Sequence, residues 1–519
     1  MNLIARLGLM IVALLVASHG FAPSSQTTKT ALTRLSAAAT EKAAPPSANS
    51  LRPPQGEGHE IDKASAAELR KRDEQTSSFA GGVVSFLPEC FRAHEGVLEG
   101  VAARSEKDIW AVGWKLDHNK NDVSQPLTLH WDGICWHELP CPALGSGARL
   151  LAVAVIPPAD AWAVGDYSDP VSGFTLTFAC RWDGNFNVWQ ISPGANVPNV
   201  DNHLYGVSGT SRQDLWAVGL YEDHINLYQT LVQHWDGKVW AIVPSPNVGG
   251  QNLANGLTAV MALSPEEAWA AGLGGGSHTL IEQWDGKTWT VVASPDAPDT
   301  KVNRINELFG IAAKSRDDIW AVGVYEAQNI LSETLILRGS PSWRYVPHPL
   351  FQGAQPLDRH WLRGVAIDPQ DGAWAVGHIS INAQGNASRP LITRGHGPKW
   401  QLIPGLNVGL QGELNGVSAI SNKDVWVVGS YTDLNHKYRL CLIEHWDGNQ
   451  WAFFPSRVEC GGGASPIGYR TDHIICAHLV RHAPKSWSTL AIEHGIIATQ
   501  IRDFIYGSAT LSADIKSTL

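Results

Sequence analysis

The chain has 519 residues and a formal net charge of -10 at pH 7, with a pI ≈ 6.0. This acidic balance provides no basic surface, so we expect no nucleic acid as a partner. The 7 cysteines are few for an exported chain and odd in number, which leaves both disulfides and free thiols open.

Residues 1–20 have the features of a secretory signal peptide. Arg6 supplies the positive charge, Leu7 to Ala17 form an apolar core, and the small residues around Gly20 suit cleavage. A retained membrane anchor is the alternative, although this apolar run is shorter than the roughly 20 residues of a membrane-spanning helix. We therefore expect a secreted or cell-surface protein whose only membrane contact is this segment.

Residues 21–80 are rich in Ala, Ser, Thr, Pro and charged residues, with hardly an aromatic residue. Such a segment is too polar to bury a core, so we predict a disordered low-complexity linker. The composition changes at Gly81, and we place a folded domain over residues 81–457.

A tryptophan-centred repeat fills this domain. Each copy has a Trp followed three residues later by Gly, and the copies follow one another at intervals of 51 to 54 residues. A second Trp closes each copy, and five copies carry Trp-Asp-Gly just before it. A period of about 50 residues is typical of propellers and solenoids. The leading tryptophans are Trp110, Trp162, Trp216, Trp269, Trp320, Trp374 and Trp426.

Four short apolar runs separated by turn residues lie inside each copy, a pattern that indicates strands. In the third copy they are Leu204 to Ser208, Leu215 to Gly219, Thr230 to Trp235 and Val239 to Val243. Seven copies of four strands fit a closed ring, because closure removes exposed sheet edges. The predicted fold is all-β, a seven-bladed β-propeller of four-stranded blades.

The copies resemble the kelch-like and Asp-box-like repeats of bacterial secreted β-propellers over about residues 95–456. The Asp-Gly-x-x-Trp hairpin is similar to the Asp-box of sialidases, but its Asp-to-Trp spacing is one residue shorter and the upstream Ser or Thr is missing. No Gly-His opens the repeat, unlike in WD40 proteins. The resemblance implies a fold and carries no activity with it.

The connections between the runs differ in length. The first two runs are joined by Ser-x-x-Asp turns such as Ser211 to Asp214, and we interpret these aspartates as turn residues rather than catalytic ones. The connections from the second run to the third, and from blade to blade, are predicted to be about ten residues or longer. Both long sets lie on one face of a propeller, where we expect function.

A small residue recurs in the first run, as expected where innermost strands crowd around an axis. The preceding residue varies from copy to copy: Glu99, Leu151, Tyr205, Asn255, Phe309, Arg363 and Asn415. With Trp361 nearby, the predicted ligand contacts are Glu99, Tyr205, Asn255, Trp361, Arg363 and Asn415. Glu99 and Arg363, the charged members, are also compatible with a simple ion pair.

Two features lie outside the repeats. Cys90 precedes the first copy and Cys460 follows the last, so a disulfide between them would close the ring; free or buried thiols are an equal alternative. Residues 458–519 form a tail in which residues 491–498 resemble the hydrophobic segment of Flp-type pilins. Polar residues interrupt its apolar run. We predict a short amphipathic capping helix, with a decayed fusion as the alternative.

We find no nucleophile motif, metal-ligand spacing or phosphate loop, and predict no catalytic residue, metal or cofactor. The main prediction is an exported, monomeric, non-catalytic binding or scaffold propeller that meets a glycan or protein near the axis. One alternative is a glycan-active enzyme at the axial mouth, with Glu99, Glu307, Glu413 and Arg363 as candidates. Another is a surface appendage component, through the pilin-like tail.

Overall fold

The computed structural model describes residues 95–454 except 121, 143, 185–186, 226, 251, 299–304, 328–329, 340–341, 349–358, 371, 381–386, 407 and 434–437. These residues belong to one compact unit. The predicted signal peptide, linker and tail lie outside them, as do Cys90, Cys460 and Cys476. Within the described part of the chain, no helical segment has the length and hydropathy of a membrane span.

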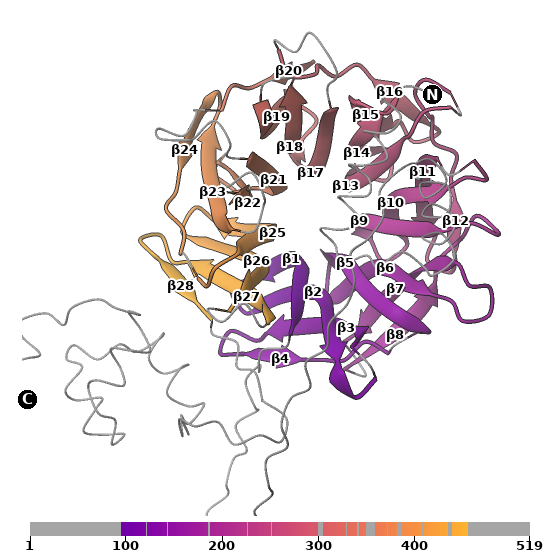
Figure 1. Cartoon of the computed structure of the whole chain (residues 1–519), viewed down its shortest axis with the longest axis horizontal. Helices are drawn as coiled ribbons and strands as arrows, with labels where there is room; N and C mark the ends of the chain where they lie inside the picture. Colours follow the sequence, from indigo (N-terminus) through magenta and orange to yellow (C-terminus); the bar gives the residue numbers. More distant parts are fainter. Residues whose placement is uncertain are drawn as a thin grey trace, which may run out of the picture. The chain divides into compact units, whose positions relative to one another are not determined.

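Seven four-stranded antiparallel blades form a ring, which confirms the predicted fold (Figure 1). Blades five and six are also joined by one parallel pairing, between Ser332 and Arg359. The innermost strands are β1 (Gly96–Ser105), β5 (Ser146–Ile156), β9 (Asn202–Ser211), β13 (Gly256–Ser264), β17 (Ile305–Ser315), β21 (Arg359–Ile367) and β25 (Gly412–Ser421). The second strands are β2 (Asp108–Asp117), β6 (Asp160–Ser168), β10 (Asp214–Glu222), β14 (Glu267–Gly274), β18 (Asp318–Ala327), β22 (Ala373–Ser380) and β26 (Asp424–Thr432).

The outer half of each blade is a hairpin with a very short last strand. The third strands are β3 (Val123–Trp131), β7 (Thr175–Asp183), β11 (Tyr228–Trp235), β15 (His278–Trp284), β19 (Ile330–Gly339), β23 (Ser388–His396) and β27 (Arg439–Trp446). The fourth strands are β4 (Trp136–Glu138), β8 (Val188–Pro193), β12 (Trp240–Ile242), β16 (Trp289–Val292), β20 (Trp343–Tyr345), β24 (Lys399–Leu402) and β28 (Trp451–Phe453). The only helical element among the described residues is the 3-10 turn η1 (His118–Lys120).

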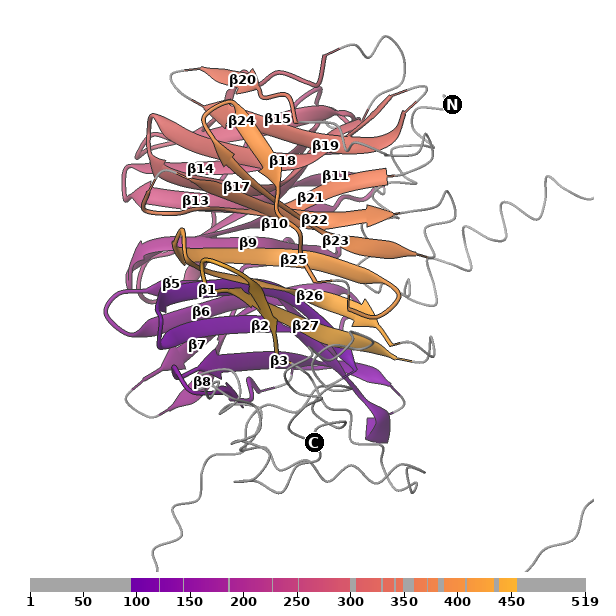
Figure 2. The ribbon, with the colours of Figure 1, turned by 90° about the vertical axis from the view of Figure 1, so that its left-hand side faces the viewer.

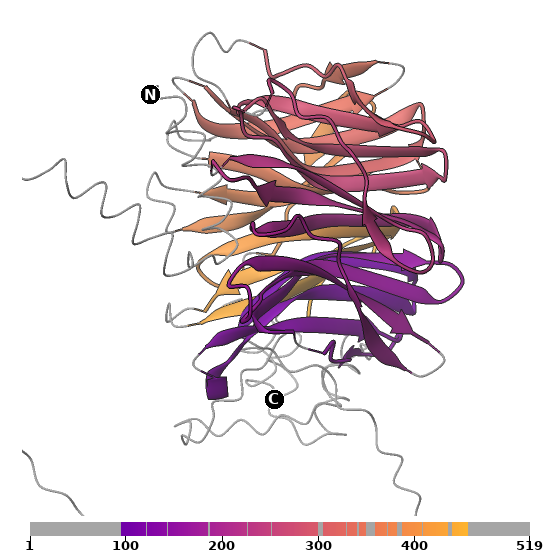
Figure 3. The same cartoon turned by 90° about the vertical axis from the view of Figure 1, so that its right-hand side faces the viewer.

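Each innermost strand packs beside the next, and β1 packs beside β25, so the ring is closed. Seen edge-on, the strands run between two faces (Figures 2 and 3). The second-to-third connections are shorter than predicted: only residues 223–227 join β10 to β11, because the strands extend beyond the apolar runs. The blade-to-blade connections, such as residues 243–255, are the long ones.

The leading tryptophans are buried between blades. Trp216 is 1% exposed and lies in the core shared by blades three and four, with its ring 4.7 Å from Trp284 and 5.1 Å from Trp289. At the closure of the ring, Trp426 of the last blade lies 5.2 Å from Trp131 of the first. Every pair of adjacent blades shares such an apolar core.

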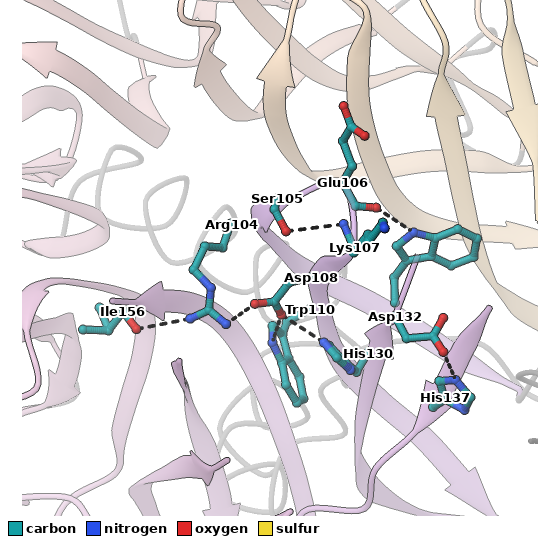
Figure 4. Close-up of polar contacts among 11 residues, drawn as sticks. Arg104, Ser105, Glu106, Lys107, Asp108, Trp110, His130, Asp132, His137 and Ile156 are labelled. Carbon is teal, nitrogen blue, oxygen red and sulfur yellow. Dashed lines mark hydrogen bonds and ion pairs between the residues drawn. The ribbon is translucent and has the colours of Figure 1, made fainter. Parts of the chain in front are cut away.

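Asp108 at the Ser-x-x-Asp turn of blade one holds the leading tryptophan (Figure 4). Its Oδ1 accepts a hydrogen bond from the indole N–H of Trp110 at 3.0 Å and lies 2.9 Å from Nε2 of His130, which stacks on Trp110. Burial favours a higher pKa of Asp108, but the contacts with His130 and Arg104 outweigh it and lower that pKa. The same Asp–His contact joins Asp214 to His234 and Asp424 to His445. These aspartates therefore serve the blade geometry.

The Trp-Asp-Gly turn is also fixed by its own side chains. Oδ1 of Asp236 accepts hydrogen bonds from the backbone N–H groups of Lys238 at 2.8 Å and Val239 at 2.9 Å. The indole of Trp235 donates to the carbonyl of Arg212 at 3.0 Å and ties the outer hairpin to the inner turn. The face with the short turns is thus occupied by residues that maintain the blades.

One disulfide joins Cys141, which follows β4, to Cys180 on β7, so it links the first two blades. The sequence did not single out this pairing. Cys135 and Cys441 are buried. The predicted alternative, Cys90 to Cys460, lies outside the described residues.

One register position of the third strands holds a buried amide in blade three and a buried carboxyl group in blades four and seven. In blade three, Gln233 accepts from the backbone N–H of Ala195 at 2.9 Å and donates to Oγ1 of Thr177 at 3.1 Å. Glu282 and Glu444 occupy the equivalent register positions in blades four and seven, and both are 0% exposed. Burial raises the pKa of each to about 8, so each is protonated at neutral pH and resembles the amide.

We expect Trp216→Ala to lower the free energy of unfolding by about 3 to 5 kcal/mol, since it empties a large core site between two blades. Chemical denaturation measures this loss, and Val239→Ala, at a side chain 58% exposed, serves as control. A Trp216→Ala variant that unfolds like the parent would show that the tryptophan cores do not hold the blades together.

The pKa shifts of Glu282 and Glu444 predict a pH dependence of stability. Each folded-state pKa lies above the ordinary 4.5, so the stabilisation is fully present below pH 4.5 and is lost as the pH rises through about 8. The double variant E282Q/E444Q does not titrate at these positions. We expect it to melt above the parent at pH 8 and to approach the parent near pH 5. The same difference in melting temperature between variant and parent at both pH values would contradict this.

Candidate functional site

Each innermost strand contains a β-bulge directly before its small residue. In blade three, Gly206 stands opposite Val218 while Leu204 stands opposite Gly219, which leaves Tyr205 as the extra residue. We call the seven extra residues the bulge layer. In ring order they are Glu99, Leu151, Tyr205, Thr258, Phe309, Arg363 and Asn415.

The bulge explains the small residues on both paired strands. A Cβ on Gly219 would lie 1.8 Å from the carbonyl oxygen of His203, so only glycine tolerates this approach. A Cβ on Gly206 would lie 3.0 Å from the Cα of Ala259 in the next blade. The residues after the bulges therefore form a tight innermost ring.

The bulge layer corrects the alignment of blade four. Ala259, not Gly256, is the small residue of β13, so Thr258 rather than Asn255 is the bulge residue. The prediction was wrong here because blade four has Ala259 where most other blades have Gly, and Gly256 lies three residues earlier. Asn255 is therefore not a member of the axial position to which we assigned it.

Asn255 instead shapes a blade-to-blade connection. It is 1% exposed, and its Oδ1 accepts from the backbone N–H groups of Val248 at 2.9 Å and Gly275 at 3.1 Å. Its Nδ2 donates to the carbonyl of Leu253 at 2.9 Å. Asn202 has a comparable role in blade three, where Oδ1 accepts from Val197. These bonds occupy the polar atoms expected to meet a ligand.

A second layer lies two residues before the bulges, nearer the face with the long connections. Its members are Val97, Arg149, His203, Gly256, Glu307, Trp361 and Glu413. The two layers are in contact: the ring of His203 stacks 6.1 Å from that of Tyr205, and the guanidinium of Arg363 lies 5.6 Å from the ring centre of Trp361. We call the two layers together the axial cluster.

A buried charge network occupies one sector of the axial cluster. Asp166 of β6 is 1% exposed; its Oδ1 accepts from Nη2 of Arg149 at 2.8 Å, and its Oδ2 lies 2.8 Å from Nδ1 of His203. Burial favours a higher pKa of Asp166, but Arg149 and His203 outweigh it and lower this pKa to about 2. Burial and the neighbouring Asp166 raise the pKa of Tyr205.

The opposite sector is built around Arg363, which is 9% exposed. Its guanidinium lies 5.6 Å from the ring centre of Phe309, in addition to its contact with Trp361. Burial lowers the pKa of Arg363, and Glu413 and Glu99 oppose this effect. The ring of His378 meets Trp361 edge-on at 4.8 Å, and burial lowers the pKa of His378 to about 4. The aromatic ring of Trp361 is thus framed by a cation and a neutral imidazole.

Glu99 and Asn415 meet where the ring closes. Nδ2 of Asn415 donates to Oε2 of Glu99 at 3.0 Å and to the carbonyl of Leu98 at 3.1 Å. The indole of Trp114 donates to Oε1 of Glu99 at 3.3 Å. Glu99 also favours the charged form of Arg363.

Two further carboxyl groups face this arginine. Glu307 is 2% exposed, and its Oε2 has no hydrogen-bond partner among the described residues. Burial raises its pKa to about 8. Oε2 of Glu413 accepts from Nη2 of Arg439 at 3.0 Å, and Nε of Arg439 donates to Oγ of Ser430. Both carboxyl groups stand two residues before a bulge, in the second layer of the axial cluster, and both favour the charged form of Arg363.

Of the predicted contacts, the structure brings five into the axial cluster and its charge network. They are Glu99, Tyr205, Trp361, Arg363 and Asn415. The prediction did not connect Arg149 with Asp166 and His203, or Arg439 with Glu413. Counting back two residues from the variable position would have located Arg149, His203, Glu307 and Glu413, but their partners on second and third strands require the strand register. Among the described residues, no group of three or more His, Cys, Asp or Glu side chains is placed to hold a metal.

No protein-family model matches the chain, and no curated protein matches it. Its fold is similar to that of an ulvan lyase, a polysaccharide lyase, at 10% identity and a TM-score of 0.39, covering 57% of this chain and 80% of that one. It is also similar to that of the alpha-L-arabinanase of Penicillium chrysogenum, at 12% identity and a TM-score of 0.37, covering 57% of this chain and 92% of that one. The acylaminoacyl peptidase of Pyrococcus horikoshii is similar at 9% identity and a TM-score of 0.40, covering 69% of this chain and 52% of the peptidase. These likenesses are remote, and we draw the function from the axial cluster itself.

The charge network of Asp166 predicts a stability effect. Asp166→Ala leaves Arg149 buried without its carboxylate and is expected to lower the free energy of unfolding by about 3 to 5 kcal/mol. The double variant Arg149→Met/Asp166→Leu removes both charges and should lose clearly less. Chemical denaturation of the two variants measures the difference, and equal losses would show that the pairing of these charges does not matter.

Proposed function

We propose that this protein is an exported β-propeller that binds a carbohydrate chain at the axial cluster. The observation that carries the proposal is the half-buried ring of Trp361 with the guanidinium of Arg363 at 5.6 Å. A sugar ring presents C–H groups on its faces and hydroxyls on its rim. The aromatic ring suits the former, while the charged and polar neighbours Arg363, Glu413 and Asn415 suit the latter.

The position of the cluster supports the same proposal. The opposite face consists of turns whose Asp and Trp side chains hold the blades, as at Asp108 and Asp236. By contrast, the axial residues differ from blade to blade and join cations, carboxyl groups and aromatic rings in one place. Binding sites commonly combine apolar surface with a few placed polar groups. Export is part of the proposal and is supported by the composition of residues 1–20.

A glycan-active enzyme is the second candidate, and one specific observation favours it. Such an enzyme requires carboxylates or arginines that converge on the axis, and Glu99, Glu307 and Glu413 each favour the charged form of Arg363 there. A carbohydrate offers many hydroxyl donors to Oε2 of Glu307, which has no hydrogen-bond partner among the described residues. We therefore place the carbohydrate reading ahead of the protein-ligand reading.

The test of binding is the double variant Trp361→Ala/Arg363→Ala on a glycan array, followed by calorimetry with the glycans that the parent retains. We expect binding to be abolished while the melting temperature changes little, because neither residue belongs to a core between blades. Asp285→Ala, in a short turn, serves as control and should retain binding. Binding that survives the axial variant and is lost in the turn variant would place the site on the other face.

A further inference from the structure

Glu307 differs from the other carboxyl groups of the axial cluster. It is 2% exposed, and its Oε2 makes no hydrogen bond with any residue that the structure describes. A buried carboxyl oxygen without a partner costs stability, so such an atom in a folded protein requires an explanation. An atom outside the chain that completes its hydrogen bonding is one such explanation.

Glu307 lies on the innermost strand β17, two residues before the bulge residue Phe309, and therefore belongs to the second layer of the axial cluster. It alters the pKa of Tyr205 on β9, although blades three and five are not adjacent in the ring, and it alters that of Arg363 on β21. Burial raises the pKa of Glu307 to about 8; Arg363 counteracts this, and Glu326 on β18 adds to it. Glu326 itself is held by Ser332, whose hydroxyl donates to it at 2.9 Å. The carboxyl group of Glu307 therefore keeps its proton at neutral pH and lies within the influence of residues across the ring.

A second carboxyl group of the same layer has the opposite environment. Glu413 accepts from the guanidinium of Arg439 at 3.0 Å, a charge-assisted contact that favours the carboxylate. Arg363 lies within electrostatic reach of both carboxyl groups. A protonated and an ionised carboxyl group in one site have the two roles that hydrolysis of a glycosidic bond requires.

We propose that the axial cluster hydrolyses a glycosidic bond, with Glu307 as proton donor and Glu413 as proton acceptor. Glu307 gives its proton to the glycosidic oxygen, and the bond between this oxygen and the anomeric carbon breaks, leaving the electron pair on the oxygen. A water molecule adds its oxygen to the anomeric carbon and loses a proton to Glu413. The products are two shorter sugars, and solvent returns the two carboxyl groups to their starting states. This inference rests on carbohydrate binding at the axial cluster.

The experiment compares the full chain with the variants E307Q and E282Q. Glu282 is the matched control, since it is also a buried glutamate with a pKa near 8 but lies on a third strand, away from the axis. The probes are 4-nitrophenyl and 2,4-dinitrophenyl glycosides of common neutral and acidic sugars, and the polysaccharides that the parent binds. Reducing-end release gives kcat and KM, and calorimetry gives binding.

We expect the parent to cleave at least one glycoside of the panel, with kcat falling as the pH rises through about 8. E307Q should lower kcat for the 4-nitrophenyl glycoside by about 10² to 10⁴-fold with little change in KM. The loss should be much smaller for the dinitrophenyl glycoside, whose leaving group needs little help from an acid. E282Q should leave both rates unchanged.

Three results would overturn the inference. An E307Q variant that cleaves like the parent excludes Glu307 as proton donor. A parent that binds a glycan by calorimetry but releases no reducing ends excludes hydrolysis and leaves the proposed binding function standing. A parent that neither binds nor cleaves any member of the panel removes the binding function and the hydrolysis together.

Discussion

The β-bulge on every innermost strand is the constraint from which the rest of the ring follows. It brings a carbonyl oxygen of that strand to 1.8 to 2.0 Å from the place of a Cβ on the second strand, as at Gly113, Gly219 and Gly429. This is why Gly completes the leading motif in every copy. The same bulge inserts one residue per blade without a ladder partner, and the fold leaves that residue free to vary. Sequence uniformity and axial diversity thus have one physical origin.

Residues that maintain the blades and residues that vary between blades lie in different parts of the ring. On one face, Asp108 holds Trp110 and His130, and Asp236 holds its hairpin, so the motif residues are committed to blade geometry. The seven apolar cores between blades lie around these tryptophans and supply the packing that closes the ring. Because stability resides there, the residues near the axis can carry buried charges whose desolvation is unfavourable by itself.

The number of blades and of strands could be predicted from the sequence. The leading tryptophans, such as Trp216, recur every 51 to 54 residues, and each motif is short enough to be recognised locally. The sequence failed where one copy departs from the others: Ala259 in place of Gly shifted the prediction to Asn255, whose bonds shape a loop. It also could not pair Cys141 with Cys180, or Asp166 with Arg149, because these contacts depend on strand register and on neighbouring strands or blades rather than on spacing along the chain.

Two buried glutamates with similar pKa values have different roles because they occupy different positions in the blades. Glu282 is protonated between blades, where Ser245 donates to its Oε2 at 2.7 Å, and it stands where blade three has Gln233. An amide fits that place equally well, so the carboxyl group there has a structural role. Glu307 has a similar pKa but stands on the innermost strand of its blade, in the axial cluster. An unsatisfied oxygen does not distinguish the two, because Oε1 of Glu282 and Oε2 of Glu307 both lack a hydrogen-bond partner among the described residues. Burial explains the retained proton in both, so the inferred role of Glu307 as proton donor depends on its place in the axial cluster and not on its pKa.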